Sequence, residues 1–341
     1  MQENAESPAN TRTSHGISPR RFCTAPMMDW SDRHCRMFWR QLSQHAFLYT
    51  EMVTTGALIH GKGGPERFIH FYEEEHPVAL QLGGSNSQEL AQCAKIAQDF
   101  GYDEVNLNVG CPSDRVQNNL IGACLMGHPQ LVADGIKAMQ DAADIPVTIK
   151  HRIGIDDQDS YAELSDFVGT IRDTGCKTFI IHARKAILDG LSPKENREIP
   201  PLKYDVVKQI KTDFPDLEII LNGGIKTHEE INHHLSWADG VMLGREAYHN
   251  PTVLLDVDEL YYGGEANLSN KKDCIRKLYP HIENHLSQGL KLSYITRHIL
   301  GLFNGEPGSR LFRRHLSEQA FKPSAGIDTI EHALSLLPDA V

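Results

Sequence analysis

Short apolar runs recur along the chain from Arg21 to Leu243, with stretches of helical periodicity between them. The runs are brief, β-branched or apolar, and do not alternate, which is typical of parallel strands buried on both faces. We predict strands at 21–25, 47–49, 78–82, 104–108, 147–151, 179–182, 218–222 and 240–243. We predict helices near 32–43, 88–100, 129–142, 160–174, 203–213, 227–234 and 247–253.

Eight strand–helix units in about 235 residues match a (β/α)8 barrel, whose usual size is about 250 residues. A doubly wound sheet is the alternative, but it would not need eight units. The block 68–76 is charged and aromatic, and it shows no obvious helix. We therefore expect an α/β TIM barrel over residues 20–262.

The pattern changes near Gly263 and is helical only from Lys271 onward. Glycines and prolines separate the expected helices, which cover 273–288, 294–302, 309–320 and 329–337. We expect a small C-terminal helical-bundle domain at 263–341. Residues 1–19 are polar and lack the apolar core of a signal peptide, so we expect a disordered tail.

Composition narrows the class of protein further. No apolar run approaches the length of a membrane span, so we expect no membrane partner. The seven cysteines are scattered and include no Cys-x-x-Cys pair, which argues against a metal site or a disulfide framework. We expect a cytoplasmic protein with no bound metal.

The charge is unevenly distributed along the chain. Residues 271–322 hold ten Lys and Arg against four Asp and Glu, a net charge of +6, which leaves −17 for the rest of a chain whose total is −11. A basic section on an acidic body indicates an anionic partner for that section. The alternative is an ordinary solvated basic helix face.

Unusual polar residues lie where the predicted strands end, and active sites of such barrels are built at those ends. The residues are Gln81, Asn108, Lys150, Arg152, His182 and Arg184. A lysine that points into a barrel mouth is costly without a polar or anionic partner. Any one of the six could be structural, but four strands ending this way weaken that interpretation.

The last two predicted strands run into Asn222-Gly223-Gly224 and Gly244-Arg245. Glycines let backbone N–H groups approach an anion, and loops after strands seven and eight are the usual phosphate site of the barrel. Pro26, Met27 and Met28 follow the first strand and form an apolar ledge, unless they are plain core. Together with Lys150 and Gln81, these features describe a riboflavin-phosphate site.

Cys111 lies in a tight loop after the fourth strand, between Gly110 and Pro112. Gly110 frees the backbone, and the proline holds the cysteine extended. Free cysteine is often a small core residue, so the pattern alone leaves both interpretations open. An unperturbed thiol titrates at about 8.5 and stays protonated at neutral pH, so a thiol beside a flavin could donate a proton.

The chain resembles the tRNA-dihydrouridine synthases, specifically their A-type bacterial branch, over about residues 21–338. The loop Gly190-Leu191-Ser192-Pro193-Lys194-Glu195-Asn196-Arg197-Glu198-Ile199-Pro200-Pro201-Leu202 points to that branch. The other matching stretches are 25–27, 48–52, 79–84, 106–113, 222–225 and 244–245. Lys150 and the Arg-Ile-Gly at 152–154 also match, and only His151 between them differs.

The resemblance implies FMN as cofactor, NADPH as reductant, and reduction of the uracil C5–C6 double bond at tRNA positions 20 and 20a. It makes Cys111 the proton donor. It assigns flavin contacts to Pro26, Met27, Met28, Gln81, Lys150, His182, Asn222, Gly223, Gly224, Gly244 and Arg245. For the target uridine and the tRNA, we expect contacts from Asn108, Arg184, Lys194, Arg197, Arg310 and Arg313. The target uridine must leave its stack in the tRNA to reach a barrel mouth. We also expect the enzyme to be a monomer.

Three other functions remain open at this point. A flavin barrel acting on a free small molecule, such as a dihydroorotate-type dehydrogenase, leaves the basic helical section without a role. An aldolase that uses Lys150 as a Schiff-base nucleophile leaves Cys111 and the ledge unexplained. A non-catalytic RNA-binding module would not need the glycine loops.

Overall fold

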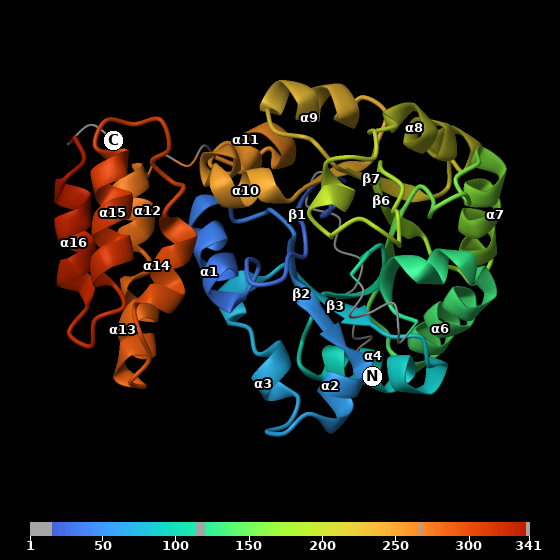
Figure 1. Cartoon of the computed structure of the whole chain (residues 1–341), viewed down its shortest axis with the longest axis horizontal. Helices are drawn as coiled ribbons and strands as arrows, with labels where there is room; N and C mark the ends of the chain where they lie inside the picture. The colour runs from blue at the N-terminus through green and yellow to red at the C-terminus, as the bar shows by residue number, and fades with distance from the viewer. Residues whose placement is uncertain (1–15, 114–119, 266, 268, 339–341) are drawn as a thin grey trace, which may run out of the picture.

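Eight parallel strands form one sheet in the order β1-β8-β7-β6-β5-β4-β3-β2 (Figure 1). Two hydrogen bonds of 2.9 Å, from Thr24 N to Phe47 O and from Phe47 N to Phe22 O, join the two edges and close the sheet into a barrel. The computed structural model describes residues 16–113, 120–265, 267 and 269–338. The strands are β1 Phe22–Thr24, β2 Leu48–Thr54, β3 Val78–Gly83, β4 Glu104–Val109, β5 Val147–Arg152, β6 Thr178–His182, β7 Glu218–Asn222 and β8 Gly240–Leu243.

Helices cover the outside of this barrel (Figure 1). They are α1 Arg33–Leu42, α2 Thr55–His60, α3 Glu66–Ile69, α4 Ser87–Asp99, α6 Pro129–Ala142, α7 Tyr161–Arg172, α8 Tyr204–Asp213, α9 His228–Leu235, α10 Arg245–His249 and α11 Val257–Tyr262, with 3-10 turns η2 Glu73–Glu75, η3 Gly122–Gly127, η4 Glu195–Arg197 and η5 Pro251–Leu254. Side chains just before several helices cap their N-termini: Asp32 and Asn86 cap α1 and α4, and Ser160 and Glu163 form a capping box on α7.

The interior of the barrel has two chemically different parts. Side chains from six strands form an apolar cluster: Cys23, Ala25, Phe47, Tyr49, Ala79, Ile180, Ile220 and Met242. Buried polar side chains of β3, β4 and β5 form hydrogen bonds with one another, among them Gln81, Asn106 and Thr148. This polar part leads from the middle of the barrel to the carboxyl end of β4.

Five helices follow the barrel and lie together on one side of it, beside α1 (Figure 1). They are α12 Lys271–Arg276, α13 Tyr279–Ser287, α14 Ser293–Ile299, α15 Ser309–Gln319 and α16 Ile327–Ser335. Asp32 at the start of α1 joins the two parts, since its carboxylate accepts hydrogen bonds from Arg297 and His298 of α14 at 2.6 and 3.1 Å. The predicted fold class is confirmed; the boundary at 262/263 stays a prediction, although Gly263 ends α11 in a left-handed conformation.

Several expectations about elements were wrong. β4 does alternate, with Glu104, Asn106 and Asn108 on the inner face, because the inner face is hydrogen-bonded rather than apolar. The predicted helix 247–253 is two turns, α10 and η5, because Pro251 cannot continue the first. The predicted helix 273–288 is likewise divided into α12 and α13, with Pro280 in the first turn of α13.

The block 68–76 does contain structure. It holds the end of α3 and the turn η2, whose Glu75 pairs with Arg36 of α1 inside the protein. Among the described residues, no helix is long and apolar enough to cross a membrane. The expected tail at 1–19 lies outside the described residues except for its last four positions.

Candidate active site at the mouth of the barrel

The backbone of the loop after β4 is held from two sides. Asn108 Oδ1 accepts hydrogen bonds from Gly110 N at 3.1 Å and from Cys111 N at 2.9 Å. On the other side, Arg152 Nε donates to Gly110 O at 2.8 Å. Cys111 is half-buried, in contrast to the fully buried Cys23 and Cys93, so its thiol is not a core group.

The Asn108 side chain is engaged at both ends. Its Nδ2 donates to Gln81 Oε1 at 2.8 Å, while its Oδ1 holds the Cys111 loop. One amide N–H of Asn108 remains for a substrate. Because Oδ1 already accepts from both Gly110 N and Cys111 N, the expected contact of Asn108 with uracil is restricted to that one N–H.

Positive charge is concentrated at the ends of β5 and β6. Burial, and after it the nearby Arg152 guanidinium, lowers the pKa of Lys150 to about 7. Burial also lowers the pKa of His182 well below its usual value, and the charges of Arg152, Lys150, Arg184 and Arg197 act in the same direction. The hydrogen bonds of the described residues include none from Lys150 Nζ. Arg152, Arg184 and Arg197 gather their charges beside Lys150 and His182, and such a concentration of cationic side chains at a barrel mouth fits an anionic ligand.

The turns after β7 and β8 bring bare backbone to this cluster. Gly223 has a φ of +117°, and a Cβ there would lie 2.6 Å from His182 Cδ2. Gly224 has a φ of +75°, and a Cβ there would meet Leu202 Cδ1 at 2.5 Å. Beside the ledge, a Cβ on Gly244 would lie 3.5 Å from Met27 Sδ. The glycine turns, His182 and the ledge therefore form one continuous wall.

Asn222 has a structural bond as well as its expected ligand role. Its Nδ2 donates to Met242 O of the neighbouring strand at 2.8 Å. Its Oδ1 is the part of the side chain that a ligand could still use.

The ledge after β1 is partly open. Met28 is 59% exposed, and Met27 packs against the inner apolar cluster. Asp29 has a positive φ of 65°, and its N–H donates to Glu51 of β2. This turn presents the Met28 side chain outward and leaves it free to pack on a ligand.

The loop at 190–202 folds over the ends of β6 and β8. Arg245 Nη1 pairs with Glu198 Oε1 at 2.8 Å, and Arg184 Nη1 donates to the carbonyls of Glu198 and Pro200. Asn196 is buried, and its carbonyl accepts a hydrogen bond from Arg152 at 2.9 Å. The structure therefore brings Arg184, Arg197 and Arg245 together, and both Lys194 and Arg197 are exposed on this loop.

Arg310 and Arg313 lie apart from the mouth, on α15. Arg310 is exposed, and Arg313 donates to Asn304. Asn304 Nδ2 in turn donates to His249 O at the end of α10, at 2.6 Å. Both arginines thus lie on the helical part, and Arg313 is linked to the segment that follows β8.

Sequence reasoning placed Arg152 among the polar strand ends of the barrel mouth without a specific role, and it gave no role to Asn196 and Glu51, which also organise this site. Arg152 bonds to backbone carbonyls that are distant in sequence, at Lys185 and Asn196, whereas the Asn196 side chain bonds to the backbone of its own loop, at Ile187 and Leu191. The sequence signal for Arg152 was its spacing of two from Lys150 on one strand. A β-bulge at Thr50–Glu51, visible only as a register shift in the β2–β3 ladder, turns Glu51 toward the ledge.

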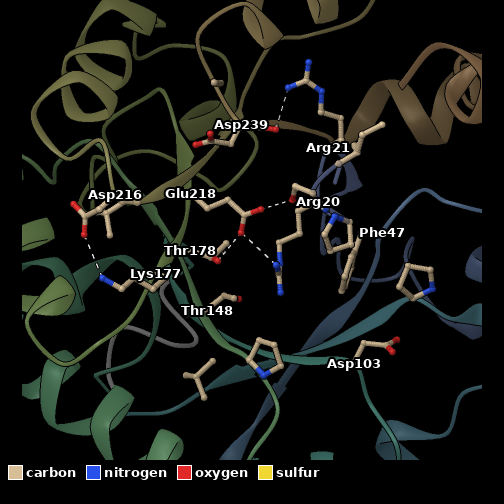
Figure 2. A pocket seen from close by; sticks show the side chains of 18 of the residues that line it. Arg20, Arg21, Phe47, Asp103, Thr148, Lys177, Thr178, Asp216, Glu218 and Asp239 are labelled. Carbon is tan, nitrogen blue, oxygen red and sulfur yellow. Dashed lines mark hydrogen bonds and ion pairs between the residues drawn. The ribbon is translucent and has the colours of Figure 1, made fainter. Parts of the chain in front are cut away.

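A large hollow lies at the opposite end of the barrel. It has a volume of about 1700 Å³ and is lined by the amino ends of the strands. Figure 2 shows its charged side chains in pairs, with Arg20 and Thr178 both bonded to Glu218 and Lys177 bonded to Asp216. Because these charges are satisfied within the protein, the hollow is a weaker candidate for chemistry than the mouth. Within the described residues, no group of three or more His, Cys, Asp or Glu could hold a metal.

One comparison with solved structures shows the fold. The old yellow enzyme homologue from Zymomonas mobilis matches with a TM-score of 0.52 at 13% sequence identity, over 70% of this chain and 88% of that one. At this identity the likeness concerns the barrel alone.

Sequence comparisons are far closer. The chain is 62% identical over 318 residues to the tRNA-dihydrouridine(20/20a) synthase of Pseudomonas aeruginosa, which covers 93% of this chain and 95% of the relative. It is 61% identical over 320 residues to the enzyme of that name from Escherichia coli K12, over 94% of this chain and 92% of the relative. The sequence model of the dihydrouridine synthase family matches residues 23–337. The chain therefore belongs to the dihydrouridine synthase family.

Proposed function

We propose that this protein is a tRNA-dihydrouridine(20/20a) synthase that uses FMN and NADPH, with Cys111 as the proton donor. The observation that carries the proposal is the half-buried thiol, held by Asn108 and Arg152 beside a cluster of cations in a chain of this family. Relatives at about 60% identity carry that name over almost their whole length. The proposal places the enzyme in the cytoplasm with its tRNA, as a monomer without a metal.

The residues at the mouth fit FMN. Arg245, Gly223, Gly224 and Gly244 would hold the phosphate, for which the bare backbone and the guanidinium are suited. Arg245 would then exchange its exposed pair with Glu198 for the phosphate. Lys150, His182 and Gln81 would hold the polar edge of the ring, and the ledge Pro26–Met28 would pack on its face. Asn222 would contribute its free oxygen.

Reduction of uridine needs a hydride at C6 and a proton at C5. FMN, reduced by NADPH, supplies the hydride when it is bound. The Cys111 thiol gives its proton to C5 and regains one from solvent, so the double bond gains two electrons and two hydrogens. Asn108 and Arg184 orient the uracil through their remaining N–H groups, and the ledge excludes water from one side.

The tRNA must present an extruded uridine to this mouth. Lys194 and Arg197 lie on the loop over the site, and Arg310 and Arg313 on α15, so both groups can contact the phosphate backbone on either side of the uridine. Such contacts position the tRNA and do not read its sequence.

Mapping of dihydrouridine in cellular tRNA tests this proposal. A strain that lacks the gene should lose dihydrouridine at positions 20 and 20a, and the wild-type gene should restore it, whereas the Cys111→Ala gene should not. Unchanged dihydrouridine at both positions in the deletion strain would contradict the assignment.

A further inference from the structure

A continuous chain of buried hydrogen bonds runs through the barrel from the Cys111 loop to the far end. Asn108 Oδ1 accepts from Cys111 N at 2.9 Å, and Asn108 Nδ2 donates to Gln81 Oε1 at 2.8 Å. Gln81 Nε2 donates to Asn106 Oδ1, and Asn106 Nδ2 donates to Thr148 Oγ1, both at 2.8 Å. The Thr148 hydroxyl donates to Glu104 Oε1. Every side chain in this chain is at most 9% exposed.

The upper end of the chain fixes its direction. Gly110 N and Cys111 N are backbone donors, so Asn108 must present its oxygen to them and its nitrogen to Gln81. Gln81 must then present its oxygen to Asn108 and its nitrogen to Asn106. The same reasoning makes Asn106 a donor to Thr148, whose hydroxyl hydrogen must point to Glu104.

The hydrogen bonds at Glu104, the other end of the chain, independently require the same donor-to-acceptor direction. Glu104 accepts from Arg20 Nε, from Tyr49 OH at 2.7 Å and from the Thr148 hydroxyl, so it acts only as an acceptor. Burial raises the pKa of Tyr49, and the Glu104 carboxylate raises it further, so the phenol stays a donor. Burial lowers the pKa of Arg20, but Glu104 and Glu218 outweigh burial and raise it, so the guanidinium stays charged.

We propose that Glu104 and Thr148 are positioning residues for the Cys111 loop. With only donors at one end and only an acceptor at the other, the chain fixes the orientation of the Asn106, Gln81 and Asn108 amides as a set. Reversal of any one amide places two donors or two acceptors face to face at low dielectric. Glu104 precedes Asn108 by four residues on β4, a strand length of about 13 Å, so the carboxylate acts from outside the mouth.

The chain also fixes what the site offers to ligands. Gln81 retains one N–H and one lone pair, whereas Asn108 retains only one N–H, because its oxygen accepts from both Gly110 N and Cys111 N. The inference depends on the proposed function only in naming Cys111 as the proton donor. The hydrogen-bond directions stand without it.

Substitution of Thr148 breaks the chain with little change in side-chain volume. Thr148→Val leaves Asn106 Nδ2 and Glu104 without their shared partner, and Thr148→Ser restores the hydroxyl. Thr178→Val is the matched control, because Thr178 lies at the same end of the barrel, as Figure 2 shows, and donates to Glu218 at 2.7 Å outside the chain.

The direct readout is hydrogen–deuterium exchange, by mass spectrometry, of the peptide that carries Gly110 and Cys111 in the flavin-free proteins. Thr148→Val should accelerate this exchange about tenfold relative to Thr178→Val, the equivalent of one net hydrogen bond of ~1.4 kcal/mol. In the FMN-saturated enzyme, kcat for dihydrouridine formation should fall about tenfold while KM for tRNA stays within about twofold. Thr148→Ser should restore both.

Equal exchange at Gly110 and Cys111 in the two valine variants would overturn the proposal, as would a Thr148→Ser variant that behaves like Thr148→Val. If Thr148→Val accelerates exchange as expected but the wild-type protein forms no dihydrouridine, the proposed function is rejected and the positioning role stands. Should Thr148→Val fail to fold, Asn106→Leu supplies the second break: an apolar side chain can neither donate to Thr148 nor accept from Gln81, and the same exchange comparison with Thr178→Val applies.

Discussion

In the proposed reaction, only the reduction of uridine needs the Cys111 thiol, and the reduction of FMN by NADPH does not. Cys111→Ala should retain FMN and oxidise NADPH at nearly the wild-type rate, because neither step needs the thiol. Dihydrouridine formation should fall roughly 10²–10⁴-fold through loss of a general acid. Stopped-flow flavin reduction and analysis of the tRNA product measure the two halves separately.

Cys124→Ala is the matched control, since Cys124 is also half-buried and lies in the nearby turn η3. It should form dihydrouridine at close to the wild-type rate. Full activity of Cys111→Ala would show that Cys111 only fills space.

Lys150 gives the flavin-free protein a defined pH dependence. Its pKa falls from 10.5 to about 7 on folding. Between these values the unfolded chain binds the extra proton, so the contribution of Lys150 to stability improves as the pH rises and is least favourable at and below pH 7. Relative to Lys150→Met, the wild type should therefore gain stability between pH 7 and pH 10, as measured by urea unfolding.

Lys95→Met, which removes an exposed lysine of α4, serves as the reference for general charge effects. A difference between wild type and Lys150→Met that stays constant from pH 7 to pH 10, after this correction, would refute the buried-lysine account.

Single residues were predictable where their signal is local. The Gly-Cys-Pro sequence at 110–112 is contiguous, so the special position of Cys111 could be inferred without a structure. The partners of Arg152 are carbonyls at Gly110, Lys185 and Asn196, which only the fold brings together. Its role as a clamp was therefore not predictable from the sequence.

Among the elements, the turn after β7 combines strain with close packing. Gly223→Ala would place a methyl group 2.6 Å from His182 Cδ2 at a φ of +117°. We expect a loss of about 1–3 kcal/mol in unfolding free energy together with weaker FMN binding. Thermal unfolding and fluorescence titration with FMN measure the two effects.

Gly244→Ala is the comparison, because Gly244 has a φ of −108° and its new methyl group would meet nothing closer than 3.5 Å. This variant should keep the wild-type unfolding temperature. Equal stability of both alanine variants would show that the turn after β7 tolerates a side chain.

Strands were predictable to within a few residues because each is a short apolar or β-branched run between turn residues. β2 extends to Thr54, well beyond its predicted end at residue 49, because a bulge lets the chain continue alongside β3. The polar inner face of β4 is present in the sequence as alternation of Glu104, Asn106 and Asn108, but the expectation of non-alternating strands missed it. Its meaning depends on Gln81 and Thr148 of the neighbouring strands, which the local pattern does not identify.

On the scale of the whole molecule, the basic C-terminal section has less unpaired positive charge than its composition indicates. Lys271 and Arg276 pair with Glu306 and Glu331, and Arg297 pairs with Asp32 of the barrel. Lys272 is buried against the carbonyl of Leu337. A count of charges along the sequence cannot show such pairs, because their partners lie in other helices.

The cations that remain available give a prediction for tRNA binding. Replacement of both Arg310 and Arg313 with alanine should weaken binding and reduce the slope of log affinity against log salt by about one unit for each phosphate that an arginine no longer neutralises. The flavin spectrum should not change, because α15 lies apart from the mouth. The control is the double variant Lys271→Ala/Arg276→Ala, whose cations already have carboxylate partners. Equal affinity and slope in the parent and the Arg310/Arg313 variant would reject the role of α15.

The most direct test of the central claim is reconstitution of the reaction with purified components. The FMN-loaded protein, NADPH and an unmodified tRNA transcript should yield one dihydrouridine for each NADPH that tRNA addition consumes, at positions 20 and 20a. NADPH oxidation that is unaffected by tRNA and leaves every uridine intact would contradict the account.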